Sequence, residues 1–255
     1  MNQKQWEILC KFREAYKAKI QEWSTRIPEL QSLQKQAAEL AGTPAYPFET
    51  PVVYNRDLDK ITIEDDIRLI VIGDNPGKDE QLKKNNRYLV GQAGKIADGF
   101  FRRNPELKTD FRKNVIILNK TPVHSAKTAQ LKKIMSSGGK AVSDLILESQ
   151  LWMAEKTAEL HCNLNTAADS NSAGPELWMV GYSELKGKGF FIPYRDKLKD
   201  GYAGTPEVWS KVYVFQHFSM NRFTIDLGEL TDGMDKPLLE KIHYTGDLHK
   251  KEIFR

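Results

Sequence analysis

The sequence predicts an α/β protein: a three-layer sandwich with a central, mainly parallel four-stranded sheet, helices on both faces, and an N-terminal helical extension. Four short apolar runs are separated by helical segments, an order of elements that is typical of a parallel sheet. The runs are rich in β-branched residues and apolar on both faces, as expected of buried parallel strands. Hydrophobic residues make up 40% of the 255 residues, which is enough for a substantial core.

The N-terminal part predicts two helices packed on the core. Apolar side chains recur at helical spacing from Trp6 onward, with charged residues between them. Pro28 is expected to begin the second helix, which ends before a proline-rich connection. We therefore expect residues 1–45 to form a helical extension and residues 46–255 to form the α/β domain.

Four strands and several helices follow in that domain. The predicted strands are Ile67–Ile72, Val115–Leu118, Glu176–Val180 and Val212–Phe215. The predicted helices span residues 94–103, 126–163 with a break at Gly138 and Gly139, 190–198, and the tail from Lys236.

Residues that could take part in binding or catalysis follow the predicted strands. Asp74 and Asn75 come after the first strand, Asn119 after the second, Gly181 after the third and His217 after the fourth. Ligands of parallel sheets bind outside the carboxyl ends of the strands. The sequence therefore predicts a site at this edge of the sheet.

The composition limits the cellular compartments and the kinds of cofactor that we expect for this protein. The two cysteines, Cys10 and Cys162, match no metal spacing and favour a reducing compartment over a disulfide framework. No run approaches the ~20 apolar residues of a membrane span, and the first residues lack an apolar signal segment. The five histidines are scattered without the spacing of metal ligands. We expect a cytoplasmic monomer without metal, cofactor or membrane contact, and its net charge of +4 is compatible with nucleic acid.

Four short segments resemble motifs of the uracil-DNA glycosylase superfamily, in the same order. Gly73–Gly77 (G-D-N-P-G) resembles the first, catalytic motif, and Val90–Gly94 resembles a V-G-x-A-G run of the thermophilic-type branch. The strand end Ile117–Asn119, with Pro122 after it, resembles the strand whose final Asn reads the uracil edge in the single-strand-selective branch. His217–Ser219 resembles the H-P-S of the second motif.

The resemblance implies catalytic roles for Asp74, Asn75 and His217. Asn75 would orient the attacking water, and Asp74 would supply a carboxylate that stabilises the oxocarbenium-like sugar. His217 would donate a hydrogen bond to the oxygen anion that develops on uracil. Each residue also has a structural interpretation, Asp74 and Asn75 as turn formers and His217 as a histidine that supports a strand end.

The resemblance also implies contacts to the base and to DNA. Residues expected to bind or stack on the base are Asn119, Tyr88, Leu89, Gly73 and Gly77. Residues expected to contact the DNA backbone, or to fill the gap left by a flipped base, are Gly91, Gly94, Ser219, Met220, Asn221 and Arg222. The glycines could equally be plain turn residues, and Ser219 a helix N-cap.

Several departures indicate a divergent branch that mixes features of the two named families. Leu89 stands where the family has the stacking Phe, with Tyr88 one residue earlier, and Phe218 replaces the proline of the second motif. Two cysteines cannot supply the four ligands of the iron–sulfur cluster found in the thermophilic-type branch. The N-terminal helices have no obvious counterpart in the family.

The expected function is a DNA glycosylase that flips uracil or a related deaminated base out of DNA and hydrolyses its N-glycosidic bond. The first alternative is a protein of the same fold that binds nucleic acid without cleaving it. A second alternative is a phosphate-binding α/β enzyme, because Gly73–Lys78 resembles a P-loop. That motif needs four residues before Gly-Lys, whereas here three intervene and Asp79 follows.

Overall fold

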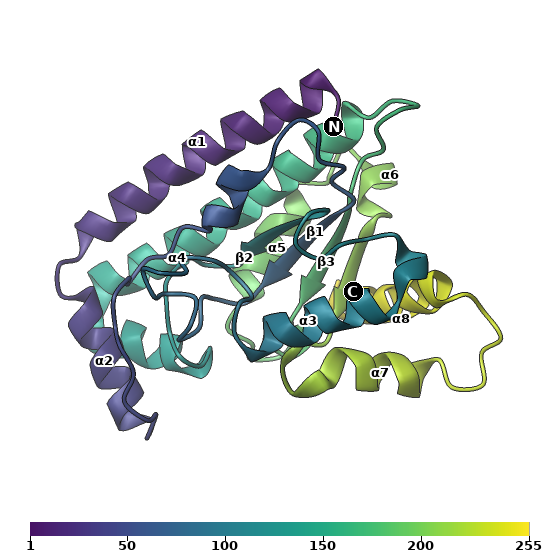
Figure 1. Cartoon of the computed structure of the whole chain (residues 1–255). Coiled ribbons are helices and arrows are strands. Elements are labelled where there is room, and N and C mark those ends of the chain that lie inside the picture. The colour runs from purple at the N-terminus through teal and green to yellow at the C-terminus, as the bar shows by residue number, and fades with distance from the viewer. Residues whose placement is uncertain (255) are drawn as a thin grey trace.

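The computed structural model describes residues 1–254 and has an all-parallel four-stranded sheet at its centre (Figure 1). The strands are β1 (Leu69–Gly73), β2 (Val115–Asn119), β3 (Glu176–Val180) and β4 (Val212–Phe215), in the order β2-β1-β3-β4. Helices cover both faces, so the predicted three-layer α/β class and its four strands are confirmed.

Parallel pairing brings the four carboxyl ends to one edge of the sheet. Gly73 at the end of β1 pairs with Asn119 at the end of β2, and Val180 of β3 pairs with Phe215 of β4. Ile72 of β1 also pairs with a residue of β3. The residues that follow β1, β2, β3 and β4 therefore emerge at one level, which we call the carboxyl edge.

The two faces of the sheet bury separate apolar clusters. Along β1, Ile70 and Ile72 join one cluster, whereas Leu69 and Val71 join the other, as the two-residue period of a strand requires. The first cluster is covered by α1 (Gln3–Arg26), α2 (Leu30–Leu40), α4 (Ala129–Thr166) and α5 (Ile192–Asp200). The second is covered by α3 (Gln92–Arg103), α7 (Arg222–Leu230) and α8 (Leu238–Ile253), and Figure 1 shows the two groups on opposite sides.

The N-terminal helices share the core of the sheet. Leu9, Tyr16 and Trp23 recur on one side of α1 and are fully buried against the cluster that contains α4. Asn2 begins α1 with a capping box, in which its side chain accepts from the backbone of Gln5 and the Gln5 side chain accepts from Asn2. The two predicted helices are confirmed.

A glycine breaks α4 where the sequence indicates a break. Gly139 has φ 68° and ψ −162°, a conformation that only glycine adopts readily. The part of α4 before Gly139, residues 129–138, is thereby directed separately from its long second part. This first part begins beside the loop that follows β1.

Short helices were not anticipated from the sequence. They are η1 (Arg56–Lys60), η2 (Pro105–Leu107), η3 (Tyr182–Leu185), α6 (Pro206–Trp209), η4 (Ser219–Asn221) and α7. Segments of three to nine residues carry too few apolar repeats to be separated from loops by periodicity.

Residues 1–254 contain neither a candidate membrane-spanning helix nor a candidate metal-ligand group. No helix there is long and apolar enough to cross a membrane. No group of three or more His, Cys, Asp or Glu residues in that range could hold a metal ion.

Candidate functional site

A buried ion pair joins the ends of β1 and β2 at the carboxyl edge. Asp74 follows β1, and Lys120 follows Asn119 of β2. The Lys120 ammonium donates to the Asp74 carboxylate and to the backbone oxygen of Val180 at the end of β3. The Lys120 side chain is fully buried, whereas 13% of the Asp74 side chain is exposed. The pair therefore presents the carboxylate, and not the ammonium, to solvent.

Glycine at the end of β3 makes room for this carboxylate. Gly181 has φ 94°, and a Cβ at that position would collide with the carboxylate of Asp74. The Phe191 ring lies 5.0 Å from the Lys120 nitrogen, within range of a cation–π contact. The glycine beside Asp74 and the aromatic ring near Lys120 thus help to hold the pair in place.

His217 lies within electrostatic reach of the same pair. Burial lowers the pKa of His217, Asp74 acts to raise it, and Lys120 acts to lower it. Burial also lowers the pKa of Lys120, and the Asp74 carboxylate opposes that effect. The charges of Asp74 and Lys120 thus act on the pKa of His217 in opposite directions.

The tautomer of His217 follows from its contacts with Ser219. The backbone N–H of Ser219 donates to Nδ1 of His217 at 3.1 Å, and the Ser219 hydroxyl lies 2.8 Å from the same atom. Because Nδ1 accepts from the backbone, the neutral imidazole carries its proton on Nε2. His217 thus has an N–H donor that faces away from its own loop.

Asn75 is held firmly by the connection that leads into α4. Its amide nitrogen donates to the backbone oxygen of Ser125 at 3.1 Å and to the Ser125 hydroxyl at 3.0 Å. Its oxygen accepts from the Thr128 hydroxyl at 3.0 Å. That hydroxyl has a single hydrogen, so the second oxygen of Asp74, 3.5 Å away, gains little from it. Asn75 is anchored, and one carboxylate oxygen of Asp74 stays open to a water.

Asn119 carries a buried amide group whose nitrogen has no partner. The side chain is 1% exposed, and within residues 1–254 nothing accepts a hydrogen bond from Nδ2. Its oxygen lies against Gly73, where any Cβ would collide with it. An unpartnered buried donor costs about 1–3 kcal/mol, so such a group calls for a ligand or water that uses it.

The turn after β4 lines a cavity of about 460 Å³. Met220 and Asn221 both have positive φ, at 52° and 56°, which is uncommon for residues with side chains. The Met220 side chain is 76% exposed. The residues around the cavity are Ser183, Gln216, His217, Ser219, Met220, Arg222, Ile225, Asp226 and Glu229. His217 therefore has open space beside it, whereas Asp74, Asn75 and Asn119 do not line this cavity.

Tyr88 does not reach the carboxyl edge, which corrects its expected stacking role. The ring is fully buried, and its hydroxyl contacts the hydroxyl of Tyr16 and the backbone oxygen of Val53. Neither face of the ring is free for a base. Leu89 is also buried and has φ 51°, so it shapes the loop from inside.

A buried carboxyl group ties the loop after β1 to the segment before α3. Glu80 accepts from the backbone N–H of Gly77 at 3.1 Å and from that of Leu89 at 2.9 Å. Burial raises the pKa of Glu80 to about 7. Gly94 packs against the Leu89 carbonyl, where a Cβ would overlap the backbone, and Gly91 is the N-cap of α3. Gly94 is therefore required by close packing, whereas an added Cβ would meet nothing at Gly77 and only the Asp79 carboxylate, at 3.4 Å, at Gly91.

Aromatic rings contact the loop after β1 from an unexpected segment. His124 lies 2.7 Å from the backbone oxygen of Pro76 through its Nδ1. The Tyr46 hydroxyl lies 3.0 Å from His124 Nε2, and the Phe48 ring packs 4.8 Å from the imidazole. Tyr46 and Phe48 are partly exposed, so the connection before β1 places rings beside this loop.

The sequence-based prediction missed three contributors to the site: Lys120, Ser125 and Thr128. Lys120 could have been found, because it directly follows a residue already placed at a strand end. Ser125 and Thr128 lie in the connection before α4, and only the fold brings them to Asn75.

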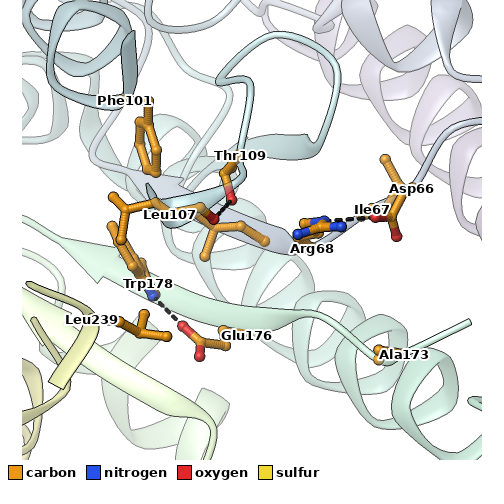
Figure 2. Close-up of a pocket in the computed structure, with 12 residues that line it drawn as sticks. Asp66, Ile67, Arg68, Phe101, Leu107, Thr109, Ala173, Glu176, Trp178 and Leu239 are labelled. Carbon is orange, nitrogen blue, oxygen red and sulfur yellow. Dashed lines mark hydrogen bonds and ion pairs between the residues drawn. The ribbon is translucent and has the colours of Figure 1, made fainter. Parts of the chain in front are cut away.

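A second cavity lies at the opposite, amino edge of the sheet. Its volume is about 370 Å³, and it opens between the starts of β1 and β3. Figure 2 shows Arg68 paired with Asp66, and the Trp178 indole donating to Glu176. The polar groups of these four residues therefore have hydrogen-bond partners within the cavity wall.

Comparison of the chain with protein-family models, with curated proteins and with solved structures returned no match.

Proposed function

We propose that the protein is a DNA glycosylase that removes uracil or a related deaminated base by hydrolysis of the N-glycosidic bond. The observation that carries the proposal is the buried Asp74–Lys120 pair at the carboxyl edge, with the unpartnered amide of Asn119 next to Lys120 in the chain and His217 following β4 at the same edge. Cleavage of this bond develops positive charge on the sugar and negative charge on the base. A carboxylate and an N–H donor at one edge match both charges.

Asp74 is the residue proposed to stabilise the sugar cation. One of its oxygens is held by Lys120, and the other is open at the edge. A water placed between that oxygen and the anchored Asn75 would face the anomeric carbon. Asn75 would then orient the water, and Asp74 would accept its proton.

Asn119 and His217 are the residues proposed to read and stabilise the base. Entry of a base would have to uncover the buried Asn119 amide, whose unpartnered Nδ2 would then donate to a uracil carbonyl while its oxygen accepts from the ring N–H. His217 would donate from Nε2 to the oxygen that becomes negative. A buried amide rejects a base with the wrong donor pattern, because its own groups would stay unpaired.

The turn after β4 is proposed to contact DNA. Ser219 would bind a phosphate, and the exposed Met220 or Arg222 would enter the gap that a flipped base leaves. Asn221, between them, completes the turn with positive φ. Phosphate contacts release counterions, so binding is expected to weaken as salt is added.

Two observations favour the alternative of binding without cleavage. The amide of Asn75 is engaged with Ser125 and Thr128, and Tyr88 is unavailable for stacking. A protein of this kind would still bind single-stranded or uracil-containing DNA at the carboxyl edge. It would leave the glycosidic bond intact.

One experiment separates the two functions. Uracil-containing single- and double-stranded DNA is incubated with the wild type or with Asn75→Ala, in EDTA, and abasic sites are cut with alkali. The enzyme proposal predicts cleavage by the wild type that survives chelation and falls in the variant. Binding without cleavage above the variant's level would support the alternative.

A further inference from the structure

The buried lysine beside Asp74 has no role in the proposed reaction as described so far. Lys120 is fully buried, so its ammonium cannot touch the sugar or the base while Asp74 stays in place. Taking an ammonium out of water is expensive unless it is paired and hydrogen-bonded. Its retention at the carboxyl edge therefore requires an explanation.

Three groups hold the ammonium of this lysine. Its nitrogen donates to the Asp74 carboxylate and to the backbone oxygen of Val180, and the Phe191 ring lies 5.0 Å away. These contacts come from the loop after β1, the end of β3 and the residue before α5. Lys120 thus links the ends of β2, β1 and β3 through a single ammonium.

We propose that Lys120 is a positioning residue, which fixes the Asp74 carboxylate at the carboxyl edge, where His217 also follows its strand. The proposal deepens the function described above, and its activity arm rests on that function. Without Lys120, the Asp74 carboxylate would lose its cation and its hydrogen bond, and could turn toward the first turn of α4. Without Asp74, the buried cation would be left without its counter-charge.

The charged groups around these residues are few within the described chain. Asp74 and Glu184 act on Lys120, and Asp74 and Lys120 act on His217. Around the cavity beside His217, the charged residues are Arg222, Asp226 and Glu229. The proposal therefore makes opposite predictions for the two members of the pair, because a cation and a carboxylate shift an imidazole in opposite directions.

The first test is the titration of His217 in the free protein, followed by nuclear magnetic resonance. Asp74→Asn should lower the pKa of His217, and Lys120→Met should raise it. Lys78→Met removes an equal charge from an exposed position of the same loop and should leave it unchanged. If Lys120→Met does not fold, Asp74→Asn/Lys120→Met removes the whole pair, and its His217 should titrate higher than in Asp74→Asn alone.

Equal His217 titrations in the wild type and in Lys120→Met, or in Asp74→Asn and the double variant at a pH where Lys120 of Asp74→Asn is still protonated, would overturn the proposal. This readout needs no catalysis, so it judges Lys120 even if the protein releases no uracil. Where uracil release is observed, Lys120→Met should lower kcat by roughly 100-fold with little change in KM, because it disturbs charge stabilisation in the transition state. A rise in KM at unchanged kcat would instead make Lys120 a residue that only supports DNA binding.

Discussion

The two edges of the sheet treat polar groups in opposite ways. At the amino edge, Arg68 pairs with Asp66 and Glu176 with His243, and all four side chains are at least a quarter exposed. At the carboxyl edge, a fully buried ammonium holds a largely buried carboxylate, and the Asn119 amide keeps an unused donor. Exposed ion pairs whose members satisfy each other need no ligand, whereas a buried donor without an acceptor calls for a ligand or a water. The contrast supports the proposal that the chemistry lies at the carboxyl edge, although both edges have a cavity.

The largest expected difference between the edges is in catalysis. Asp74→Asn should reduce uracil release by about 1000-fold, because it removes the charge that stabilises the sugar cation. Glu176→Gln, the matched change at the amino edge, should leave release at the wild-type rate. Single-turnover assays on uracil-containing DNA measure both. Similar losses in the two variants would remove the distinction between the edges.

The edges should also differ in how much their ion pairs stabilise the fold. Lys120→Met leaves Asp74 without its buried partner and should lower the free energy of unfolding by about 4 kcal/mol. Arg68→Met breaks an exposed pair and should cost less than about 1 kcal/mol. Urea unfolding at pH 7 gives both values. The Asp74→Asn/Lys120→Met variant should be destabilised by less than the sum of its parts, since the two residues interact.

Burial near the carboxyl edge should also make stability depend on pH. Burial raises the pKa of Glu80 from 4.5 to about 7, so in that interval the folded protein binds a proton that the unfolded chain lacks. The free energy of unfolding should therefore fall by about 3 kcal/mol between pH 4.5 and 7, relative to Glu80→Gln. Urea unfolding of the wild type and of Glu80→Gln across this range tests the sign. A difference that grows with pH would contradict the assignment.

The smallest effect is expected where a predicted site residue turned out to lie in the core. Tyr88→Phe removes a hydroxyl that contacts Tyr16 and Val53, and should cost about 1 kcal/mol of stability. DNA binding and uracil release should not change, because the ring does not reach the carboxyl edge. Thermal unfolding and a binding titration give the two readouts, and Tyr16→Phe serves as the matched core control. Weaker DNA binding by Tyr88→Phe alone would restore a role at the site.

The sheet and its edge could be predicted because each strand can be recognised from its own short stretch of sequence. Runs such as Ile67–Ile72 are apolar on both faces, and the residues after them must emerge at a common edge once the strands are parallel. The break in α4 was predictable for a similar reason, since paired glycines interrupt a helical pattern. Asp74 and Asn119 could thus be placed from sequence.

Contacts that depend on tertiary packing could not be predicted. Tyr88 looked like a stacking residue by its position in a motif, yet helix α1 supplies Tyr16 as its partner from 72 residues away. Ser125 and Thr128 meet Asn75 only because the connection before α4 lies beside the loop after β1. The pairing of Lys120 with Asp74 depends in turn on Gly181, which leaves room for the carboxylate.

Adding free uracil to the labelled protein tests the central assignment most directly, because it asks which edge receives the base. The account predicts that the side-chain amide of Asn119 and the imidazole of His217 both change chemical shift with uracil and not with adenine. The Trp178 indole N–H at the amino edge should stay unchanged. Shifts of the Trp178 indole, with none at Asn119 or His217, would contradict the account.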